Sequence, residues 1–506
     1  MSNLESLGHI VPELILGGMA VLIFLVAAAA RKHMVWRTWL FPALTVAGLV
    51  AAIGHLCYHS ATLSSQGAIF SGLLASDAFA VYFRILVITA VLVCVFISIG
   101  SSSLSISRSG EYHGLLLVMA MGMCFLAGAN NLLMIYISLE TVSLCSYLLT
   151  GWDHKRIRSH EAGLKYVLFG GVASGIMLFG FSIMYGLFGS LNLQDISVAL
   201  NSNAICFSSV HNSALLLSLV FILGGMGYKI AAVPFHMWCP DVYEGAPTPI
   251  TALLSVGPKA VGFALIIRFF YSLFIAPVTC SHSLETVTTN IPWLLILAVL
   301  SISSMILGNF AALVQNNLKR MLAYSSIAHA GYTLMGVIAG GQRGLEAVAI
   351  YLGIYLLMNM GAFSVVSIVA RTTGSEDINV FRGLGKRMPV MGLMMTIFLV
   401  SLTGLPPTAG FIGKFYLFSA LLETGGYWYW ILAVIGVLNS VVALYYYARV
   451  MKAMYFEKPE GEIIVHEANT LPAAAVALVL GVLTLFFGIF WQPLADAASW
   501  SAAIFH

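Results

Sequence analysis

Long runs of apolar residues, separated by short polar breaks, make up nearly all of this sequence. A run of about 20 apolar residues is long enough to cross the hydrocarbon core of a bilayer as a helix. The run over 389–424 is too long for one straight span, and Leu405, Pro406 and Pro407 predict a break within it. Counting it once, the pattern predicts about fourteen transmembrane helices, near residues 10–30, 39–58, 77–100, 114–130, 132–150, 161–187, 212–236, 248–276, 291–314, 318–340, 344–370, 389–424, 428–452 and 470–491.

The composition agrees with this pattern. Of the 506 residues, 60% are hydrophobic and only 8% are charged, whereas soluble domains carry about 25% charged residues. Helical spans satisfy every backbone polar group internally, as a bilayer requires. The predicted fold class is therefore all-α: a polytopic membrane protein with one integral membrane domain over 1–506. A basic tract with interleaved aromatic residues is lacking, which argues against nucleic-acid binding.

Basic residues in the short loops predict the orientation, because such loops stay on the cytoplasmic side. The opposite side holds only Arg343, so the basic loops are expected to be cytoplasmic and both termini to lie across the membrane. The N-terminal stretch has no basic region and no small-residue cleavage site, which predicts that Ile10–Ala30 is a retained span. The basic loops hold Arg31, Lys32, Arg37, Arg108, Lys155, Arg156, Arg158, Lys319, Arg320, Arg371, Arg382, Lys386, Arg387, Arg449, Lys452 and Lys458.

The seven cysteines form no CxxC pair and no Cys/His cluster with metal-ligand spacing. Their spacing predicts that this chain ligates no iron–sulfur cluster. Most of them fall in apolar runs, where a thiol acts as a small core residue. The cysteines are Cys57, Cys94, Cys124, Cys145, Cys206, Cys239 and Cys280.

Charged residues inside predicted spans are the strongest signal of function. An ammonium group in an apolar span costs about 3 kcal/mol or more, so such residues usually serve a task. An arginine can instead reach an interface or pair locally, and this reading is favoured for Arg84 and Arg268. Glu140 has apolar sequence for more than two turns on both sides, which predicts a functional or ion-pairing role. The lysines at membrane depth are Lys165, Lys229, Lys259 and Lys414.

Two predicted spans share an interrupted pattern. Lys229 precedes Pro234 in 212–236, and Pro406–Pro407 precedes Lys414 in 389–424. These segments, the seventh and the twelfth, lie five spans apart, so they enter the membrane from opposite sides. Opposed insertion of matching units with broken helices indicates an inverted-topology repeat. The predicted organisation is three N-terminal helices in 1–110, inverted five-helix repeats in 111–276 and 291–452, and a C-terminal helix in 470–506.

A buried amine near a carboxylate can take up and release a proton, because burial favours its neutral form and the carboxylate its charged form. Glu140 and Lys229 are expected to form such a pair if their helices pack together. Lys259 and Lys414 would continue the relay. His329 is balanced between a proton-relay role and that of a hydrogen-bonded core histidine. Lys165 lies four residues after Glu161, which also fits an ordinary surface pair.

The loop PFHMWCPDVYEGAPTPI mixes aromatic, proline and acidic residues. We favour a rigid turn at the membrane interface, anchored by Trp238 and Tyr243. The alternative is a proton entry funnel through His236, Asp241 and Glu244.

Three long motifs, VPFHMWCPDVYEGAPTPITALL, NLKRMLAYSSIAHAGY and GLPPTAGFIGKFYLF, resemble the antiporter-like membrane subunits of NADH-quinone oxidoreductase, complex I. The resemblance covers essentially the whole chain. Within the family it favours the N branch, because Ser255 stands where the L and M branches typically have histidine, Lys414 stands where M usually has Glu, and no long C-terminal lateral helix follows. The three extra N-terminal helices, which animal mitochondrial counterparts lack, are present.

The resemblance implies roles for single residues. Glu140 and Lys229 match the Glu–Lys pair of a first half-channel, with Lys165 nearby. Lys259 matches a central lysine and Lys414 the lysine of a second half-channel. The implied function is proton translocation coupled to electron transfer from NADH to quinone. The implied partners are the antiporter-like M subunit, the small membrane subunits and, indirectly, the peripheral arm, which would hold NADH, FMN, iron–sulfur clusters and quinone.

Two alternatives remain at this stage. The chain fits a subunit of a Na⁺/H⁺ or multi-subunit cation/proton antiporter, since those proteins use related folds. A membrane scaffold whose charges take no part in transport is the third reading. The expected location is the bacterial inner membrane, multi-pass and with periplasmic termini, and a plastid or thylakoid membrane is less favoured.

Overall fold

Helices make up almost all of the computed structural model, which describes residues 3–29, 36–62, 67–101, 108–201, 209–274, 292–458 and 469–503. The first third contains α1 (Asn3–Leu7), η1 (Gly8–Ile10), α2 (Val11–Ala29), α3 (Arg37–Thr62), β1 (Gly67–Ile69), β2 (Leu74–Ser76), α4 (Ala78–Ser98), α5 (Ser109–Gly128), α6 (Leu132–Thr150) and α7 (Ile157–Phe188). The middle contains α8 (Leu193–Asn201), α9 (Ser209–Ile230), α10 (Cys239–Gly245), α11 (Thr248–Phe274), α13 (Trp293–Leu313), α14 (Leu318–Ala339) and α15 (Gly341–Thr373). The last part contains η3 (Ile378–Phe381), α16 (Leu384–Arg387), α17 (Pro389–Thr403), α18 (Ala409–Glu423), α19 (Tyr427–Phe456), α20 (Leu471–Ile489) and α21 (Gln492–Ala502).

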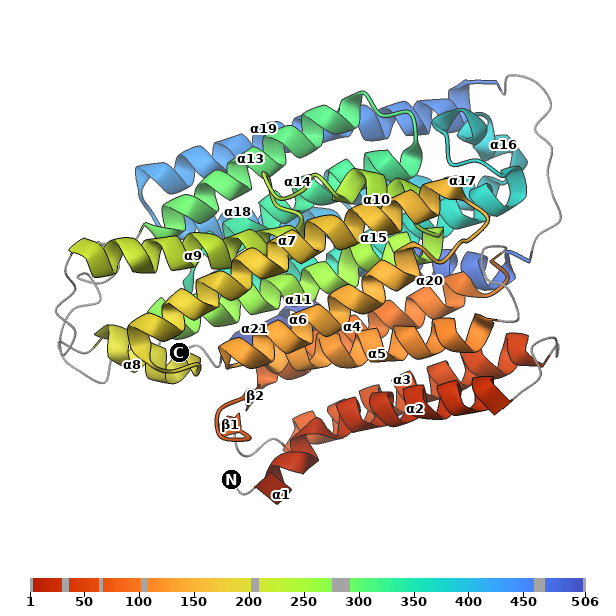
Figure 1. Ribbon diagram of the computed structural model, residues 1–506. Helices are drawn as coiled ribbons and strands as arrows, with labels where there is room; N and C mark the ends of the chain where they lie inside the picture. The colour runs from red at the N-terminus through yellow and green to blue at the C-terminus, as the bar shows by residue number, and fades with distance from the viewer. Residues whose placement is uncertain are drawn as a thin grey trace.

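Twelve described helices are long and apolar enough to cross a membrane. The 22-residue α14 and the interrupted pair α17 and α18, of 15 residues each, bring the bundle to the predicted number of about fourteen. The long helices run side by side, with α1 and α8 at one end and α16 at the other (Figure 1). The all-α polytopic fold is thus confirmed. Arg31, Lys32, Cys206, Cys280 and the predicted span limits 276 and 291 lie outside the described residues.

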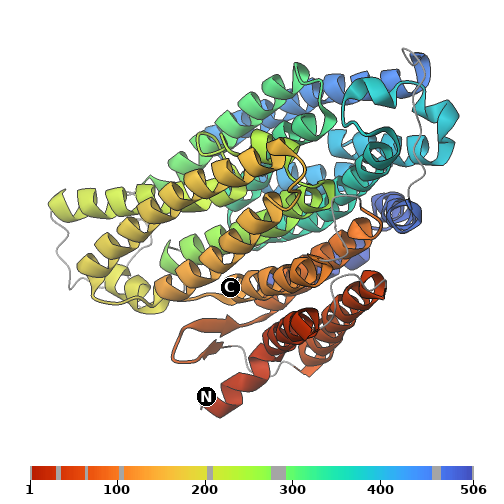
Figure 2. The same cartoon turned by 45° about the vertical axis from the view of Figure 1, so that its right-hand side comes forward.

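The first three long helices form one edge of the molecule. There, α2 and α3 pack on each other and on α5 and α4, and Figure 2 shows the N-terminal helices at the margin of the bundle. A short antiparallel hairpin of β1 and β2, which the apolar pattern did not predict, precedes α4. Its turn places Phe70 and Ser71 at positive φ, 51° and 55°.

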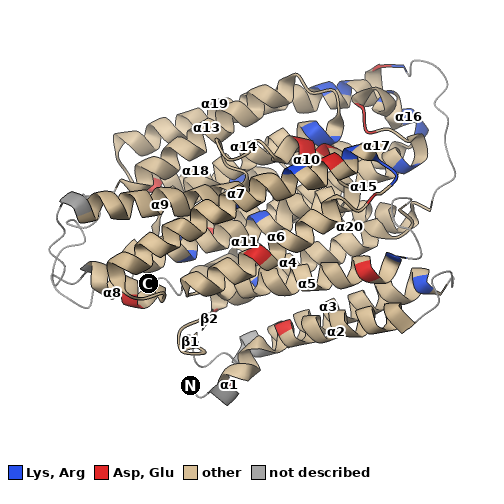
Figure 3. Ribbon diagram, in the orientation of Figure 1, with Lys and Arg blue, Asp and Glu red and all other residues tan. Residues whose placement is uncertain are grey.

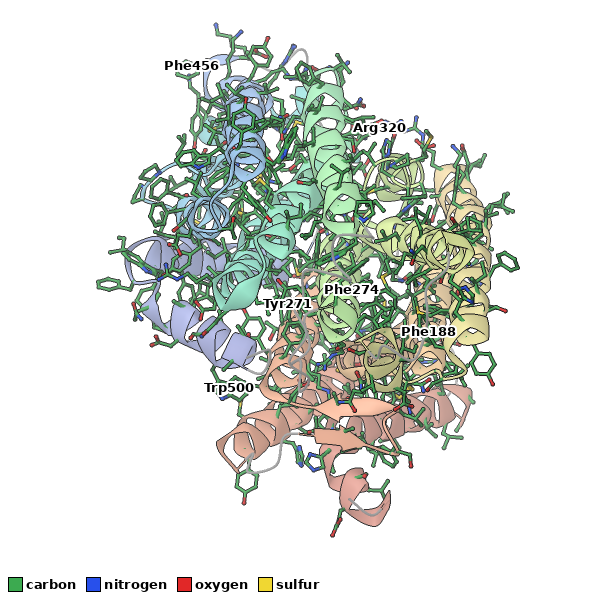
Figure 4. The ribbon with its side chains drawn as sticks, turned by 90° about the vertical axis from the view of Figure 1, so that its left-hand side faces the viewer. Phe188, Tyr271, Phe274, Arg320, Phe456 and Trp500 are labelled. Atoms are coloured by element: carbon green, nitrogen blue, oxygen red, sulfur yellow. The ribbon has the colours of Figure 1, made fainter. Side chains whose placement is uncertain are left out.

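One helix lies at the centre. All of the apolar window of α11 is buried, against 28% of the corresponding windows of α2 and α20. The helix packs on α4, α15, α9 and α14. Side chains fill the space around it, with Tyr271 and Phe274 near the middle of the view in Figure 4. The core therefore surrounds the helix that carries Lys259 and Arg268.

Charged residues gather at one end of the bundle. Lys and Arg cluster near α10, α16 and α17 (Figure 3), as the loop pattern predicts for one membrane side. Arg343 lies at the other end, where it contacts Glu423 at 2.5 Å. The chain runs through α9 towards the basic end and through α17 away from it (Figure 1). The two interrupted helices therefore enter the bundle from opposite ends.

Candidate functional site

The first interruption follows Lys229 directly. Helix α9 ends at Ile230, and Ala231 has a positive φ of 57°. The freed backbone is satisfied locally, because the Ala232 N–H donates to the Gly227 carbonyl at 2.8 Å and the Val233 N–H to the Ser304 hydroxyl at 2.9 Å. A broken helix whose groups are paired within the protein is the tolerated form of irregular backbone at membrane depth.

Lys229 reaches α6 through a serine. Its Nζ donates to Ser143 Oγ at 3.0 Å, and the lysine is 2% exposed. Glu140 lies one turn earlier on α6 and interacts with Lys229 electrostatically. Among the described residues, no carboxylate oxygen lies within ion-pair distance of the Lys229 ammonium group, and Glu140 Oε1 is buried without a hydrogen-bond partner. The structure thus places Glu140 near Lys229 without a direct contact, and the Ser143 hydroxyl that accepts from Lys229 donates to the Leu139 carbonyl at 2.8 Å.

Glu140 also faces outward. It lies in line with four exposed residues of α6, at steps of three or four residues, which place side chains on one helix face. These residues are Leu133, Ile137, Leu144 and Leu148. Glu140 is thus half-buried: it lies on this exposed stripe, while its Oε1 is buried without a hydrogen-bond partner in the described chain.

Lys259 lies on α11 and contacts α14. Its Nζ donates to Ser326 Oγ at 2.6 Å and to the Ser326 carbonyl at 3.2 Å. The same hydroxyl accepts a hydrogen bond from Tyr355 of α15 at 2.7 Å. The ammonium group also lies 5.7 Å from the ring centroid of Tyr243, within the range of a cation–π interaction. A hydroxyl and a carbonyl of Ser326 thus solvate this lysine, and no carboxylate of the described residues lies within ion-pair distance of it.

His329 continues the polar row on α14, one turn after Ser326. Its Nδ1 is hydrogen-bonded to the Tyr351 hydroxyl at 2.5 Å, and its Nε2 lies 3.4 Å from the Tyr447 hydroxyl. Tyr447 is bonded in turn to Ser325 at 2.5 Å. Both ring nitrogens thus contact groups that can accept and donate protons.

Lys414 lies on α18 just after the second interruption. Gly404 at φ 88° ends α17, and the Lys414 Nζ donates to the Thr403 carbonyl at 2.8 Å and to Ser440 Oγ at 3.1 Å. The break is thus where Leu405 and the two prolines predicted it. Lys414 also lines an open cavity of about 530 Å³ between α18 and α19, which extends to Glu423 at the far end of α18.

Lys165 lies apart from this row. Its Nζ contacts Glu161 and Asp241, each at 2.7 Å, and its side chain is 36% exposed. Arg320 (labelled in Figure 4) contacts the same Asp241 at 2.6 Å and Glu244 at 2.9 Å. The structure thus places Lys165 in a half-exposed ion-pair network at the basic end, without a contact to Lys229 among the described residues.

The acidic loop takes part in that network through α10. Burial acts to raise the pKa of Asp241, but hydrogen bonds from Lys165 and Arg320 hold it below its usual range. His236 is buried elsewhere, with Nδ1 unpartnered, and burial lowers its pKa. Trp238 stacks on Tyr166 at 4.4 Å between ring centroids. The loop is thus a packed turn, but Trp238 and Tyr243 are buried in the protein and do not anchor it at the interface as expected. Ion pairs engage two members of the alternative funnel, Asp241 and Glu244.

Two buried ion pairs were missed at the level of sequence. Arg84 contacts Glu13 of α2 at 2.8 Å, with both side chains no more than 1% exposed. Arg268 holds Asp77 with two bonds, at 2.8 and 2.9 Å. Burial acts to raise the pKa of Asp77, but the Arg268 guanidinium holds it below its usual range. The local signal was Asp77 before an apolar run, since it caps α4 through the Ala80 N–H.

The arrangement as a whole is a row of three buried amines, each hydrogen-bonded to a serine hydroxyl, in a helical bundle with two opposed breaks. Lys229, Lys259 and Lys414 are each no more than 5% exposed. Such a row can hold and pass protons, and the described residues hold no group of three or more His, Cys, Asp or Glu side chains placed for a metal. Fold and site define a polytopic, antiporter-like membrane subunit.

Comparison with known proteins gives the family. Residues 129–440 match the family described as NADH:quinone oxidoreductase/Mrp antiporter, transmembrane. NADH-quinone oxidoreductase subunit N of Anaeromyxobacter sp. (strain Fw109-5) is 45% identical over 99% of this chain and 98% of the relative. NAD(P)H-quinone oxidoreductase subunit 2 of Synechococcus sp. (strain JA-3-3Ab) is 40% identical over 97% and 90%. The chain belongs to the NADH:quinone oxidoreductase/Mrp antiporter family, in its subunit N branch.

Solved structures agree with this fold. A chain of respiratory complex I from Thermus thermophilus with bound Aureothin superposes with a TM-score of 0.76 at 30% identity, over 96% of this chain and 98% of that one. A chain of the Mrp complex from Dietzia sp. DQ12-45-1b superposes with a TM-score of 0.81 at 20% identity, over 98% and 97%. The second likeness concerns the fold alone.

Proposed function

We propose that this chain is the proton-translocating membrane subunit N of an NADH-quinone oxidoreductase. It contributes proton pumping, while NADH oxidation and quinone reduction take place in other subunits. The observation that carries this function is the set of three buried amines, each hydrogen-bonded to a serine hydroxyl within the bundle. The full-length likeness to relatives with the subunit N name supports the choice of complex.

The path that we propose runs along the middle of the bundle. Glu140 and Lys229 form its first station, and Ser143 accepts a hydrogen bond from Lys229 there. Lys259 is the central station, bonded to Ser326, and His329 with its tyrosines extends the polar contacts along α14. Lys414 is the last station, and its cavity leads towards Glu423. Lys165 acts at the basic end, where it ties α7 to α10.

The physical basis of transfer is the balance between burial and pairing. Removal from water favours the neutral amine, whereas a nearby anion favours the ammonium form. A small approach or retreat of the Glu140 carboxylate would therefore shift the proton occupancy of Lys229. At the next stations, hydroxyl groups rather than carboxylates solvate the charge, so each amine can release its proton without leaving a strong ion pair.

The position of Glu140 on an exposed apolar stripe, with Oε1 lacking a hydrogen-bond partner in the described chain, supports a place inside a larger membrane assembly. We propose that another membrane subunit of the complex covers the exposed stripe of α6. We further propose that the antiporter-like M subunit and the small membrane subunits are the neighbours, with flavin, iron–sulfur clusters and quinone held by partner subunits. The peripheral arm is then contacted indirectly.

We propose a bacterial inner membrane as the location. The basic residues gathered near α10 and α16 support a cytoplasmic placement of that end, since positively charged short loops stay inside. The end with α1 and α8 then faces the periplasm, together with both termini. Proton release through the cavity beside Lys414 would be towards the periplasm.

The test is the assembled complex with Lys229→Ala. We expect intact assembly but a loss of proton pumping, and Lys386→Ala, in the exposed turn of α16, serves as the matched control. Pumping at the normal ratio of protons to electrons in the Lys229→Ala complex would overturn the assignment. A sodium-driven pH gradient made by the purified chain alone would favour a cation antiporter instead.

A further inference from the structure

A second cavity lies at the basic end of the molecule, away from the row of lysines. Its volume is about 340 Å³, and it lies between the starts of α3, α5 and α20 and the end of α4. Its described lining residues are Thr38, Trp39, Pro42, Ser98, Ile99, Gly100, Ser101, Ser109, His113 and Asn469. No carboxylate is among them, and the proton path described above does not use this cavity.

Three helices begin at this cavity. Thr38 is the second residue of α3 and Ser109 the first of α5, while Asn469 lies two residues before α20. The first backbone N–H groups of a helix have no partner within it and carry partial positive charge. Neither α5 nor α20 is capped by a side chain at its start. The cavity therefore collects three positive helix ends against one negative end, that of α4, where Arg371 contacts the Ile99 carbonyl. This balance favours anions such as phosphate groups.

One buried side chain in the cavity, that of His113, has a ring nitrogen without a hydrogen-bond partner in the described chain. His113 is 2% exposed, and its Nδ1 lies 2.7 Å from the Ser109 carbonyl. A carbonyl only accepts, so Nδ1 carries the hydrogen and the other ring nitrogen, Nε2, is left free. Nε2 has no hydrogen-bond partner within the described chain. Buried polar atoms are paired as a rule, so this nitrogen indicates a missing ligand.

The wall of the cavity is fixed in place. Arg371 donates to the Ile99 carbonyl at 2.9 Å and to the Asn469 carbonyl at 3.2 Å. Gly100 has a φ of 76°, and a Cβ atom there would lie 2.6 Å from the Asn469 carbonyl oxygen. The turn after α4 is thus held against the start of α20, which keeps the space beside it open.

The surroundings favour a lipid over a free anion. Trp39 lines the cavity and is 62% exposed, as suits a residue at the membrane–water interface. Arg37 begins α3 and keeps two guanidinium nitrogens unpartnered within the described chain. A ligand that places a phosphate group near positive helix ends and apolar chains beside an exposed tryptophan is a phospholipid.

We propose that this cavity binds the headgroup of a phospholipid from the leaflet at the basic end. The phosphate lies at the helix starts, and a hydroxyl group of the headgroup donates to His113 Nε2. Phosphatidylglycerol has both groups and is the probe that we choose. The site is independent of proton transfer and would hold the N-terminal helices α3 and α5 to α20 through a bound lipid.

Native mass spectrometry of the purified full chain tests this site. The delipidated protein is incubated with phosphatidylglycerol, with diacylglycerol of the same chains, or with inorganic phosphate. We expect one phosphatidylglycerol to bind more tightly than diacylglycerol, and inorganic phosphate not to displace it. Equal binding of both lipids overturns headgroup recognition, and displacement by phosphate makes the cavity a free-phosphate site. This comparison needs only the wild-type protein.

Two histidine variants locate the contact. His113→Asn keeps a donor towards the Ser109 carbonyl but loses the atom at Nε2, whereas His113→Gln keeps a polar atom near Nε2. We expect His113→Asn to bind phosphatidylglycerol about tenfold more weakly, as suits one lost hydrogen bond, and His113→Gln to bind it as the wild type does. The exposed His160, changed to Asn, is the matched control. Wild-type affinity in His113→Asn overturns the proposal.

Discussion

Lys259 donates two hydrogen bonds to the same residue, Ser326, one to its hydroxyl at 2.6 Å and one to its carbonyl at 3.2 Å. The hydroxyl also accepts from Tyr355. Ser326 is therefore the point at which three helices, α11, α14 and α15, share one polar contact. A proton that leaves Lys259 meets this hydroxyl first, which makes Ser326 as informative to change as the lysine itself.

Replacing Ser326 with alanine removes the shared hydroxyl while the carbonyl contact remains. We expect proton pumping by the assembled complex to fall by about tenfold, the effect of one hydrogen bond to a charged group. The measurement is the initial rate of acidification in vesicles, relative to the amount of complex. Ser303→Ala is the control, because that hydroxyl donates only to backbone carbonyls. Equal rates in wild type and Ser326→Ala would contradict a role for the hydroxyl.

A side chain that lines the cavity beside Lys414 should be accessible to water. Ser419 lines the cavity, so Ser419→Cys, in a chain without its native cysteines, should react with a water-soluble thiol reagent. Reaction requires contact with the aqueous phase, since the thiolate is the nucleophile. It should occur from the side of α1 and α8, in vesicles of known orientation. Ser364→Cys, at a fully buried position of α15, should stay unreactive, and labelling only from the basic side would refute this path.

Asp241 predicts a dependence of stability on pH. Its pKa is held below the ordinary value by Lys165 and Arg320, so its ionised form stabilises the folded state. That stability is complete above the unfolded pKa of about 4 and is lost as the pH falls through the lower folded value. The network is half exposed, so the contribution is at most about 1 kcal/mol.

The measurement is the thermal unfolding midpoint of the full chain in detergent at pH 7 and near pH 3. Wild type should lose more stability on acidification than Asp241→Asn, which has no carboxylate to protonate. Asp195→Asn provides a control, because Asp195 lies in α8 and accepts only from Ser190 and Asn192. Identical acid sensitivity of wild type and Asp241→Asn would remove Asp241 from this account.

Replacing one residue of the Glu13–Arg84 pair should destabilise the fold far more than replacing both residues. Glu13→Gln leaves the Arg84 charge buried without its anion, and breaking a buried pair in this way costs about 3 to 5 kcal/mol. Replacing both residues by apolar ones of similar size, Glu13→Leu with Arg84→Met, should restore most of the lost stability.

Thermal unfolding of the wild type and of these two variants measures this difference. Asp496→Asn, at an exposed position of α21, is a control for loss of a carboxylate. If the double variant is as unstable as Glu13→Gln, the pair stabilises the fold by more than neutralisation of charge, and the prediction is wrong.

Local patterns in the sequence predicted much of this fold. Pro406 and Pro407 marked the interruption between α17 and α18 because proline cannot continue a helix. Apolar length located the spans, since the bilayer imposes it. The hairpin of β1 and β2 was not predicted, because its strands have only three residues each and no clear alternation. Pairing between distant residues could not be predicted. Nothing in the sequence around Glu13 indicates that it contacts Arg84, 71 positions later.

The site was predictable to a similar degree. Lys229, Lys259 and Lys414 stood out as charges in apolar runs, and the structure places them inside the bundle. Their contacts were not predictable, because Ser143 and Ser326 come from other helices. Lys165 was expected at membrane depth but lies in a half-exposed network, since Asp241 and Glu161 bind its ammonium group there. The residues that a buried lysine contacts depend on how the helices pack, and a single sequence does not reveal that packing.

Because α11 is completely buried, its residues meet different requirements from those of the outer helices. Lipid contacts the outer helices, such as α2 and α20, and restricts them to apolar side chains on the outward face. Other helices, α4 and α15 among them, surround α11 on every side, so its side chains contact protein and not lipid. That helix can hold Lys259 and Arg268 without exposing either to hydrocarbon. During synthesis it can reach this environment only after α15 has been made, so the first half of the protein waits for the second to complete its core.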